Sequence, residues 1–435
     1  MTSNEEQLRG LPQRIATGGP DWLVGLRRSA AQHLEERGFP TRKTEAWRFT
    51  PVEPLARASF APAPSAAADR ARAVAARRVG DDGTWRLIVA NGRPVLDAAG
   101  APPDGVSVRS LAEVLEREPG LLEGQLGAHA PKEDFAALNA ALFTDGVVLR
   151  VDDGAVVERP LHLVHVGLAG DATAAAYPRV LVLVGRSAQA RLVETFVVDG
   201  GAEHLTNVVA EVALAEDAQL DHVRVNEGAP NGLHAGALAV HQARSSVYRS
   251  RVVTLGGALS RLDLRATLAG EGAECHLEGV YYAAGTDHVD HHTRVDHATP
   301  RCASTEVYRG ILDDKGHGVF DGTVIVRPHA QHSDAHQENR NLLLSDEAGV
   351  HTKPHLEIEA DDVKCSHGAT IGSLDEAQAF YLRTRGIGAE QARALLTFAF
   401  VRELLDRIPH EPLRHRLGAA LLDRLPHGDA IRELA

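Results

Sequence analysis

The stretch at residues 339–374, NRNLLLSDEAGVHTKPHLEIEADDVKCSHGATIGSL, decides the fold of this chain. Within it, residues 355–359 alternate apolar and polar side chains, with Leu356 and Ile358 on one side. This alternation is typical of a β-strand with one buried face. A second, short extended piece covers residues 362–365 and leads into residues 366–370, and the pattern beyond them is helical. The stretch therefore predicts the last strands of a β-rich region and its junction with a helical one.

Two potential metal ligands stand near the end of this stretch. Cys365 and His367 are two positions apart in a segment with strand character, so both side chains are expected on the same face. A thiolate and an imidazole on one face can bind iron or zinc. Because a lone cysteine in an apolar strand is commonly just a small buried side chain, His367 is the stronger candidate. We place His367 at the strand-to-helix junction, between Ser366 and Gly368.

The β-rich region extends backward from this stretch over residues 146–372. Short runs rich in Val and Leu alternate there with turns that contain Gly, Asp or Asn, and no amphipathic helix interrupts them. Strands at a spacing of roughly 8–12 residues are typical of sandwiches, barrels and solenoids. The region is too long for one ordinary sandwich and has no long crossover. We therefore predict a mainly β fold with a solenoid core, although no fixed repeat motif is visible.

An N-terminal helical and mixed domain is predicted for residues 1–145. A helix begins near Asp21 and ends at Gly38, and a strand pair covers residues 85–95. Ser110 and Glu113 form a capping box that opens another helix. The stretch at residues 61–76 is rich in Ala and Pro, and we predict a linker or an irregular surface segment there. A further short helix is expected over residues 134–143.

A C-terminal helical domain is predicted for residues 373–435. Ser373 and Glu376 form a capping box for its first helix. The next helix, over residues 389–408, has a wide apolar face that includes Leu395, Leu396, Phe398, Val401, Leu404 and Leu405. A face of this size needs a partner, which is either the end of the solenoid or another subunit.

Composition excludes several classes of function. The chain has 435 residues and a net charge of −13, which argues against nucleic acid as a partner because phosphate binding needs a basic surface. Its three cysteines (Cys275, Cys302 and Cys365) are too few for a four-thiolate site. A P-loop is absent from the sequence. With no signal-peptide pattern and no apolar run of membrane-spanning length, we expect a cytoplasmic protein without a membrane partner.

Two other motifs suggest alternative functions. His288, Asp290 and His292 share one face of a strand, as the ligands of a metal-dependent β-helix enzyme would, although such residues more often form the polar face of a solenoid strand. The acidic pairs at residues 313–314 and 361–362 are compatible with a polysaccharide-cleaving β-helix. Such pairs occur more often in turns.

Several strings resemble the SufB/SufD family of the SUF iron–sulfur assembly system. The strongest is KCSHGAT at residues 364–370, which has the form found in the SufD branch, whereas SufB-type paralogues carry a Glu-His-Glu-Ala-Thr-type string there. The other matching strings lie at residues 41–42, 45, 47–50, 288–290, 292–293, 295–297, 318–320, 339–346, 352–354, 356–358, 360–363, 375–376, 380–383 and 385–387. A SufB-type paralogue is the nearest alternative to this assignment.

The resemblance implies a right-handed parallel β-helix with helical N-terminal and C-terminal domains, and a non-catalytic scaffold role. It further implies a heterodimer with SufB through the β-helix and a homodimer when the chain is isolated. A SufC ATPase would dock on the C-terminal helices, where the six apolar residues named above on the helix at residues 389–408 would bind it. His367 would lie at the SufB interface, beside Cys365, and act with a SufB cysteine as a transient ligand of the nascent cluster. No stably bound cofactor is implied, only a transient iron–sulfur cluster shared with SufB.

Overall fold

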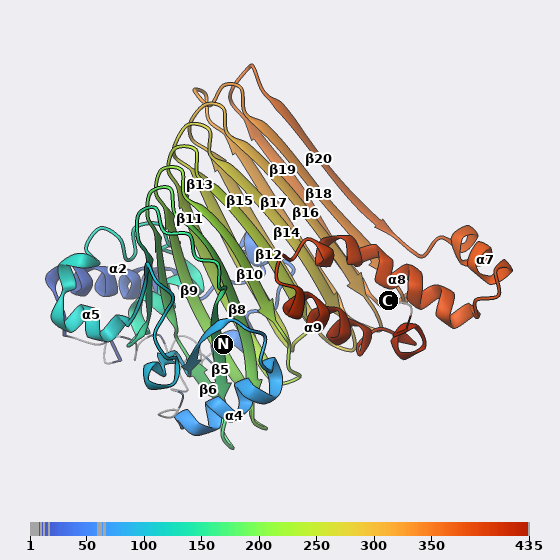
Figure 1. Ribbon diagram of the computed structural model, residues 1–435, viewed down its shortest axis with the longest axis horizontal. Helices are drawn as coiled ribbons and strands as arrows, with labels where there is room; N and C mark the ends of the chain where they lie inside the picture. Colours follow the sequence, from blue (N-terminus) through green and yellow to red (C-terminus); the bar gives the residue numbers. More distant parts are fainter. Residues whose placement is uncertain are drawn as a thin grey trace.

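The computed structural model describes residues 18–58 and 67–433, together with residues 8, 11, 14, 15 and 63. Its core is a β-solenoid made of two facing parallel sheets, and helices flank it at both ends of the chain (Figure 1). The predicted mainly β fold, with a solenoid core and helical flanks, is confirmed.

From β7 onward, successive strands of the chain fall in alternate sheets, so one turn of the solenoid consists of one strand from each sheet. The first sheet contains, in spatial order, β2 (Arg93–Pro94), β1 (Trp85–Ala90), β5 (Leu161–Leu168), β8 (Gln189–Asp199), β10 (Gln219–Asn226), β12 (Val247–Leu255), β14 (Glu274–Ala283), β16 (Ala303–Leu312), β18 (Asp334–Leu343) and β20 (Lys364–Gly372). The second contains β3 (Val106–Ser110), β4 (Gly146–Val151), β7 (Arg179–Val184), β9 (His204–Leu214) with the short β6 (Ala174–Ala176) beside it, β11 (Gly232–Gln242), β13 (Leu259–Leu268), β15 (His288–His297), β17 (His317–Val326) and β19 (Gly349–Ile358).

The solenoid has a regular turn length that no sequence motif marks. Residues that face each other in adjacent turns of the first sheet lie 27 to 31 positions apart, as the series Val247, Glu274, Ala303, Asp334 and Lys364 shows. The predicted spacing of 8–12 residues between strands was too short. The strands from β11 onward are themselves 9 to 11 residues long, and a turn follows each one.

Side chains alternate between the interior of the solenoid and its outer faces, as the pleat of a strand requires. Most interior positions are apolar, and Leu163, Val182, Leu220 and Leu264 are almost completely buried. Burying one such side chain stabilises the fold by about 1.5–3 kcal/mol. Polar side chains also occupy interior positions, and they are described with the site below.

The N-terminal helices cover the outer faces of both sheets. The regular helices are α2 (Asp21–Arg37), α3 (Glu53–Ala58), α4 (Ala68–Val79), α5 (Leu111–Arg117) and α6 (Asp134–Leu142), and the 3-10 turns are η1 (Glu45–Trp47), η2 (Leu96–Ala98) and η3 (Pro119–Leu121). Leu34, Trp47 and Phe135 pack on the outer face of the second sheet. Val74 of α4 packs on the outer face of the first sheet. The N-terminal region is thereby fixed to the solenoid wall.

Several local predictions in this region are confirmed. The strand pair at residues 85–95 is β1 and β2, α2 ends at Gly38, and the Ser110 hydroxyl accepts a hydrogen bond from the Glu113 backbone N–H. The linker predicted for residues 61–76 is wrong from Ala68 onward, because an alanine-rich segment with an apolar stripe facing the sheet forms α4 instead. Residues 61, 62 and 64–66 of that stretch lie outside the described residues.

The C-terminal helices are α7 (Glu376–Thr384), α8 (Ala389–Asp406) and α9 (Glu411–Leu422), followed by η4 (Gly428–Ile431). The apolar faces of α8 and α9 pack on the outer face of the first sheet, so the flank of the chain's own solenoid covers them. The cap of α7 is Asp375, which accepts from two backbone N–H groups, and the predicted Ser373 box is wrong. Within the described residues, no helix is long and apolar enough to cross a membrane.

The two ends of the solenoid are built differently. At the first end, β2 pairs with β1 and β3 pairs with β4, both in the antiparallel direction, and these strands finish the two sheets. At the other end, β20 pairs with β18 alone and β19 with β17 alone. No described strand follows β19 or β20 in either sheet, so this end of the solenoid is open (Figure 1).

Candidate functional site: the open end of the solenoid

The last turn of the solenoid is exposed. In β20 every residue except the half-buried Cys365 is exposed, and β19 contains only half-buried and exposed residues. A terminal strand presents a row of backbone N–H and C=O groups that its own sheet does not use. Natural proteins usually protect such an edge, so two long uncovered edges at one end indicate a surface for another chain.

Both predicted site residues lie on the inner face of this last turn. Cys365 is directly opposite Ala335 of β18, and His367 is opposite Gln337. Ala335 and Gln337 are buried in the solenoid interior, so Cys365 and His367 continue an interior face that β20 leaves uncovered. The prediction that both side chains share a face is confirmed.

The predicted position of His367 at the strand-to-helix junction is wrong. His367 lies in the middle of β20, because the strand stays in register with β18 as far as Gly372, which pairs with Leu342. The helix begins only at Glu376. His367 is therefore held by a regular parallel ladder and not by a turn.

The thiol of Cys365 is kept in its protonated form. Burial, and then the negative charge of Asp334, raise the pKa of Cys365 above its ordinary value. Only the thiolate is a strong nucleophile and metal ligand. Cys365 therefore needs a nearby cation or metal to displace its proton before it can act as a ligand.

Behind His367, two buried polar side chains continue its row into the interior. Gln337 lies opposite Glu306 of β16, and the Gln337 Nε2 donates a hydrogen bond of 2.6 Å to the Glu306 Oε2. Both side chains are almost completely buried. Sequence reasoning missed them. The signal available in the sequence was Glu306. It occupies an inward position in residues 303–312, where the other inward side chains are apolar or small.

The structure overturns the interpretation of His288, Asp290 and His292 as a metal site. They do share the outer face of β15, but the Arg261 guanidinium and the Thr50 hydroxyl occupy one oxygen of the Asp290 carboxylate, each at 2.5 Å. His288 contacts Thr50 as well. The residues that the structure describes contain no group of three or more His, Cys, Asp or Glu side chains that could hold a metal ion. The acidic pairs at residues 313–314 and 361–362 lie in the connections between strands.

The Asp290 cluster fixes the N-terminal region to the solenoid. The Arg261 guanidinium lies 3.9 Å from the centre of the Trp47 ring, and it also donates to the Ala46 carbonyl. A cavity of about 460 Å³ lies beside this contact, between α2, α6 and the second sheet. The charges of Arg261 and Arg265 in its wall are paired with Asp263 and Glu133.

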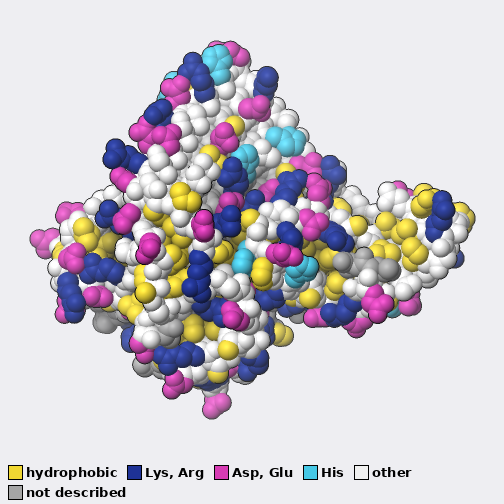
Figure 2. Space-filling view, viewed as in Figure 1, with side chains coloured by type: hydrophobic (Ala, Val, Ile, Leu, Met, Phe, Trp, Pro, Cys, Tyr) yellow, Lys and Arg dark blue, Asp and Glu magenta, His cyan; other side chains and the backbone are white. Residues whose placement is uncertain are grey.

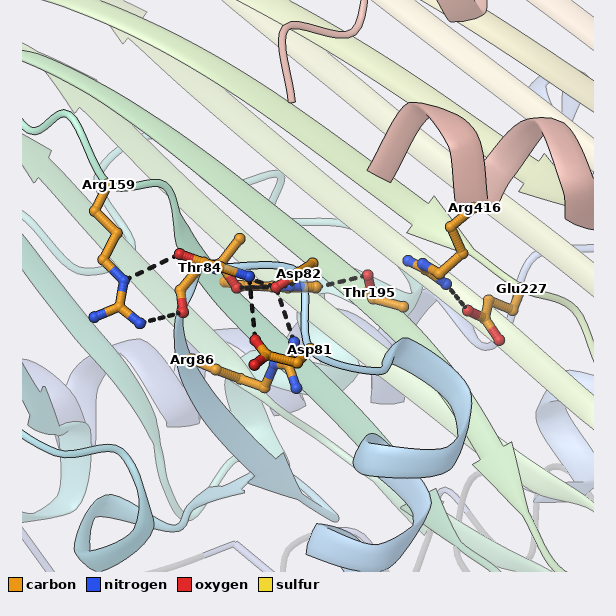
Figure 3. A network of polar contacts seen from close by, with 10 residues as sticks. Asp81, Asp82, Thr84, Arg86, Arg159, Thr195, Glu227 and Arg416 are labelled. Atoms are coloured by element: carbon orange, nitrogen blue, oxygen red, sulfur yellow. Dashed lines mark hydrogen bonds and ion pairs between the residues drawn. The ribbon is translucent and has the colours of Figure 1, made fainter. Parts of the chain in front are cut away.

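A second buried network, drawn in Figure 3, resembles a catalytic triad in connectivity. The His162 ring contacts Asp82 Oδ2 through Nδ1 at 3.2 Å and Thr195 Oγ1 through Nε2 at 2.9 Å. All three side chains are buried on the outer side of the first sheet. Because no substrate can reach them there, the network stabilises the packing of β1, β5 and β8.

The six residues predicted to dock SufC are mostly turned inward. Phe398, Val401, Leu404 and Leu405 are buried against the first sheet, whereas Leu395 and Leu396 are half-buried. The exposed apolar side chains of this region are instead on α7, where Phe380 is 63% and Tyr381 56% exposed. Figure 2 shows hydrophobic side chains gathered on the lobe at the right, where α7 lies in Figure 1. A groove of about 600 Å³ between α8 and α9 contains Arg402, Arg414 and Arg432 in its lining.

The fold and its open end define a class of protein, a parallel β-solenoid with helical flanks whose last turn is uncovered and carries a cysteine and a histidine on its inner face. Comparison with known proteins identifies the family. Residues 167–400 match the model of the SUF system FeS cluster assembly SufBD core domain, and residues 9–163 match that of the SufBD protein N-terminal region. The chain belongs to the SufBD family of iron–sulfur cluster assembly proteins.

Individual relatives match over nearly their whole length. An iron–sulfur cluster assembly SufBD family protein of Synechocystis is 32% identical, over 96% of this chain and 95% of the relative. The iron–sulfur cluster assembly protein SufD of Escherichia coli is 31% identical, over 93% of this chain and 95% of that protein. A SufBD family protein of Mycobacterium leprae is 30% identical, over 88% and 89% respectively. The predicted resemblance to SufD is thereby confirmed.

Proposed function

We propose that this chain is a non-catalytic, cytoplasmic scaffold subunit of a complex with SufB and SufC, and that its open solenoid end is where it meets SufB. The observation that carries the proposal is the pair of uncovered parallel edges, β19 and β20, at one end of both sheets. A second solenoid of the same family can continue both sheets and cover the interior face. An isolated chain has the same edges available for a second copy of itself.

His367, with Cys365 beside it, is the proposed contribution of this chain to the nascent cluster. Both side chains project from the uncovered inner face, so covering the end with SufB would enclose them together with residues of the partner. One chain has three cysteines, too few for the four thiolates that usually hold a cluster. In a transient cluster shared with SufB, the partner would supply the remaining ligands. The high pKa of the Cys365 thiol makes His367 the primary ligand.

The C-terminal helices are the proposed docking element for SufC. The predicted apolar residues of α8 serve mainly to hold the helix on the solenoid wall. The contact with SufC is therefore assigned to the exposed Phe380 and Tyr381 of α7, the half-buried Leu395 and Leu396, and the arginine-lined groove between α8 and α9. A movement of SufC would reach the solenoid through α8, which packs on β14 and β16.

Co-expression with SufB and SufC of the same organism tests the scaffold role. Affinity purification through this chain, followed by intact-mass analysis, should give one SufB, one copy of this chain and two copies of SufC. The intact complex should then build clusters more slowly when it carries His367→Ala. The control is His355→Ala, an exposed histidine on β19 of the same turn. A normal rate for His367→Ala would leave this chain a purely structural partner of SufB, and a solitary chain would contradict the scaffold role itself.

A further inference from the structure

The row that ends at His367 contains a buried acid without a charged partner. Glu306, Gln337 and His367 occupy successive rungs of β16, β18 and β20, and neighbouring strands lie about 4.8 Å apart. Glu306 and Gln337 have 1% and 0% of their surface exposed. The Glu306 Oε1 and the Gln337 Oε1 are both buried without a hydrogen-bond partner. Unused polar atoms of this kind are costly in a protein interior, so a functional reason is expected for them.

A second interior glutamate shows how the same solenoid treats a carboxylate that it keeps charged. Glu194 forms an ion pair with Arg224 at 2.6 Å and accepts from His165 and His222. Burial would raise the pKa of Glu194, but these partners lower it well below its usual value. Among the described residues, no cation pairs with Glu306. Burial raises the pKa of Glu306 to about 7, and Thr293 and Gln337 lower it only in part.

The titratable side chains around Glu306 on its own sheet are Cys275 of β14 and Tyr308 of β16, and burial raises the pKa of both, so both stay uncharged. From β15, His291 packs against Tyr308 and His297 contacts Ser304, and burial lowers the pKa of each histidine to about 4. None of these described neighbours changes charge near neutral pH. Across the interior, β17 presents Gly322, where an added Cβ would lie 2.3 Å from the Gln337 Nε2. The glycine leaves the space that the Gln337 amide occupies.

We propose that Glu306 and Gln337 are positioning residues for His367, and that the Gln337 amide transmits the protonation state of Glu306 to the imidazole. When Glu306 is ionised, it accepts from the Gln337 Nε2, and the amide oxygen is left to accept an N–H from His367. The outward nitrogen of the ring then carries the lone pair that a metal ion needs. This use of the row rests on the function proposed above for His367.

When Glu306 takes up a proton from water, its O–H donates to the Gln337 amide oxygen, and the amide turns over. The Nε2 then faces His367 and donates to the inward ring nitrogen, so the outward nitrogen carries N–H. In that state His367 offers a hydrogen bond to an anion such as sulfide and cannot bind a metal ion. The neutral ring keeps one proton throughout: the inward nitrogen releases its proton to water and the outward nitrogen takes one from water, so one N–H bond breaks as another forms. The protonation state of Glu306 thus decides whether His367 can bind a metal ion or donate a hydrogen bond to an anion.

Nitrogen NMR of the full-length chain, labelled with ¹⁵N-histidine, tests this without a partner or a cluster. The signal of His367 is assigned by its loss in His367→Asn, and its two neutral tautomers are measured from pH 6 to 8. The tautomer ratio should change with pH in the wild-type chain and stay constant in Glu306→Gln. The matched control is Glu338→Gln, because Glu338 is adjacent to Gln337 on β18 but points outward, where it pairs with Arg340. This control should behave as the wild-type chain.

Exchanging the two residues gives a second, independent result. In the double variant Glu306→Gln with Gln337→Glu the hydrogen-bonded pair is kept, but the carboxylate moves next to the imidazole. An adjacent carboxylate can only accept a hydrogen bond, so it should hold His367 in the tautomer with the inward N–H across this pH range, which a purely structural role would not do. A constant tautomer ratio in the wild-type chain, or a ratio in the exchanged variant that still follows pH as in the wild-type chain, would overturn the proposal. Failure of cluster assembly in the complex, with this coupling intact, would instead count against the proposed function.

Discussion

The two ends of the solenoid have opposite environments. At the first end, antiparallel strands finish both sheets, and β5 is buried along its whole length under β1 and α4. At the other end β20 is exposed almost throughout. The burial of a strand depends on whether a further turn or a flanking element lies over it. None of the described residues lies over the interior face at the open end.

The largest expected effect on the free energy of unfolding comes from breaking the contact between the N-terminal region and the outer face of the second sheet. Asp290→Ala leaves the buried guanidinium of Arg261 without its closest carboxylate, which should cost about 3–5 kcal/mol of unfolding free energy. Denaturant unfolding measures this loss. Asp296→Ala is the control on the same face of β15, because its partner Arg327 is partly exposed, and it should cost about 1 kcal/mol or less. Equal losses would contradict the role given to Arg261.

A matched pair of leucines tests the difference between the ends directly. Leu163→Ala removes a completely buried side chain near the covered end and should cost about 2–5 kcal/mol. Leu356→Ala, in the half-buried last turn, should cost clearly less in the isolated chain, because less apolar surface is lost. If a partner chain covers the open end, Leu356→Ala should lose more stability in the complex than in the free chain, so its loss should come closer to that of Leu163→Ala. Thermal unfolding of the free chain and of the complex compares them.

The buried acid behind the open end should make stability depend on pH. The pKa of Glu306 in the folded chain is about 7, against an ordinary value of 4.5, so the folded state holds this proton more tightly. Its contribution is fully present below about pH 4.5, is lost as the pH rises to about 7, and stays lost above that. The loss amounts to at most about 3 kcal/mol. Glu306→Gln should flatten the stability profile in this window, whereas Glu338→Gln should leave the slope in place.

The smallest effect on stability is expected at the exposed edge itself. Ile371→Ser changes a side chain on β20 that is 51% exposed, so the unfolding free energy should change by less than about 0.5 kcal/mol. The same change should weaken association with SufB, or of the chain with itself, in sedimentation velocity. Ser366→Ala, on the outer face of β20, is the control and should associate normally. Unaltered association of Ile371→Ser would place the contact elsewhere.

Sequence reasoning identified the elements better than their surroundings. Alternation in residues 355–359 and the short extended piece at residues 362–365 predicted the last two strands. The spacing of two between Cys365 and His367 predicted their shared face, because the pleat follows directly from residue order. The limits were set by non-local contacts. Residues 61–76 had the composition of a linker, yet from Ala68 onward a sheet surface stabilises the helix α4. The end of β20 was placed too early because its ladder with β18 is a contact between distant residues.

The sequence by itself determined the mainly β solenoid, its helical flanks, the family and the candidate residues Cys365 and His367, since these depend on local periodicity and on strings of adjacent residues. Only the tertiary structure decided which faces remain free. The apolar face of α8 packs on the first sheet. Asp290 accepts hydrogen bonds from Arg261 and Thr50, which rules out the metal interpretation. At the open end, β19 and β20 remain uncovered. The tertiary structure also placed Glu306 and Gln337 behind His367, because the 27- to 31-residue turns of the solenoid bring together side chains that are far apart in the chain.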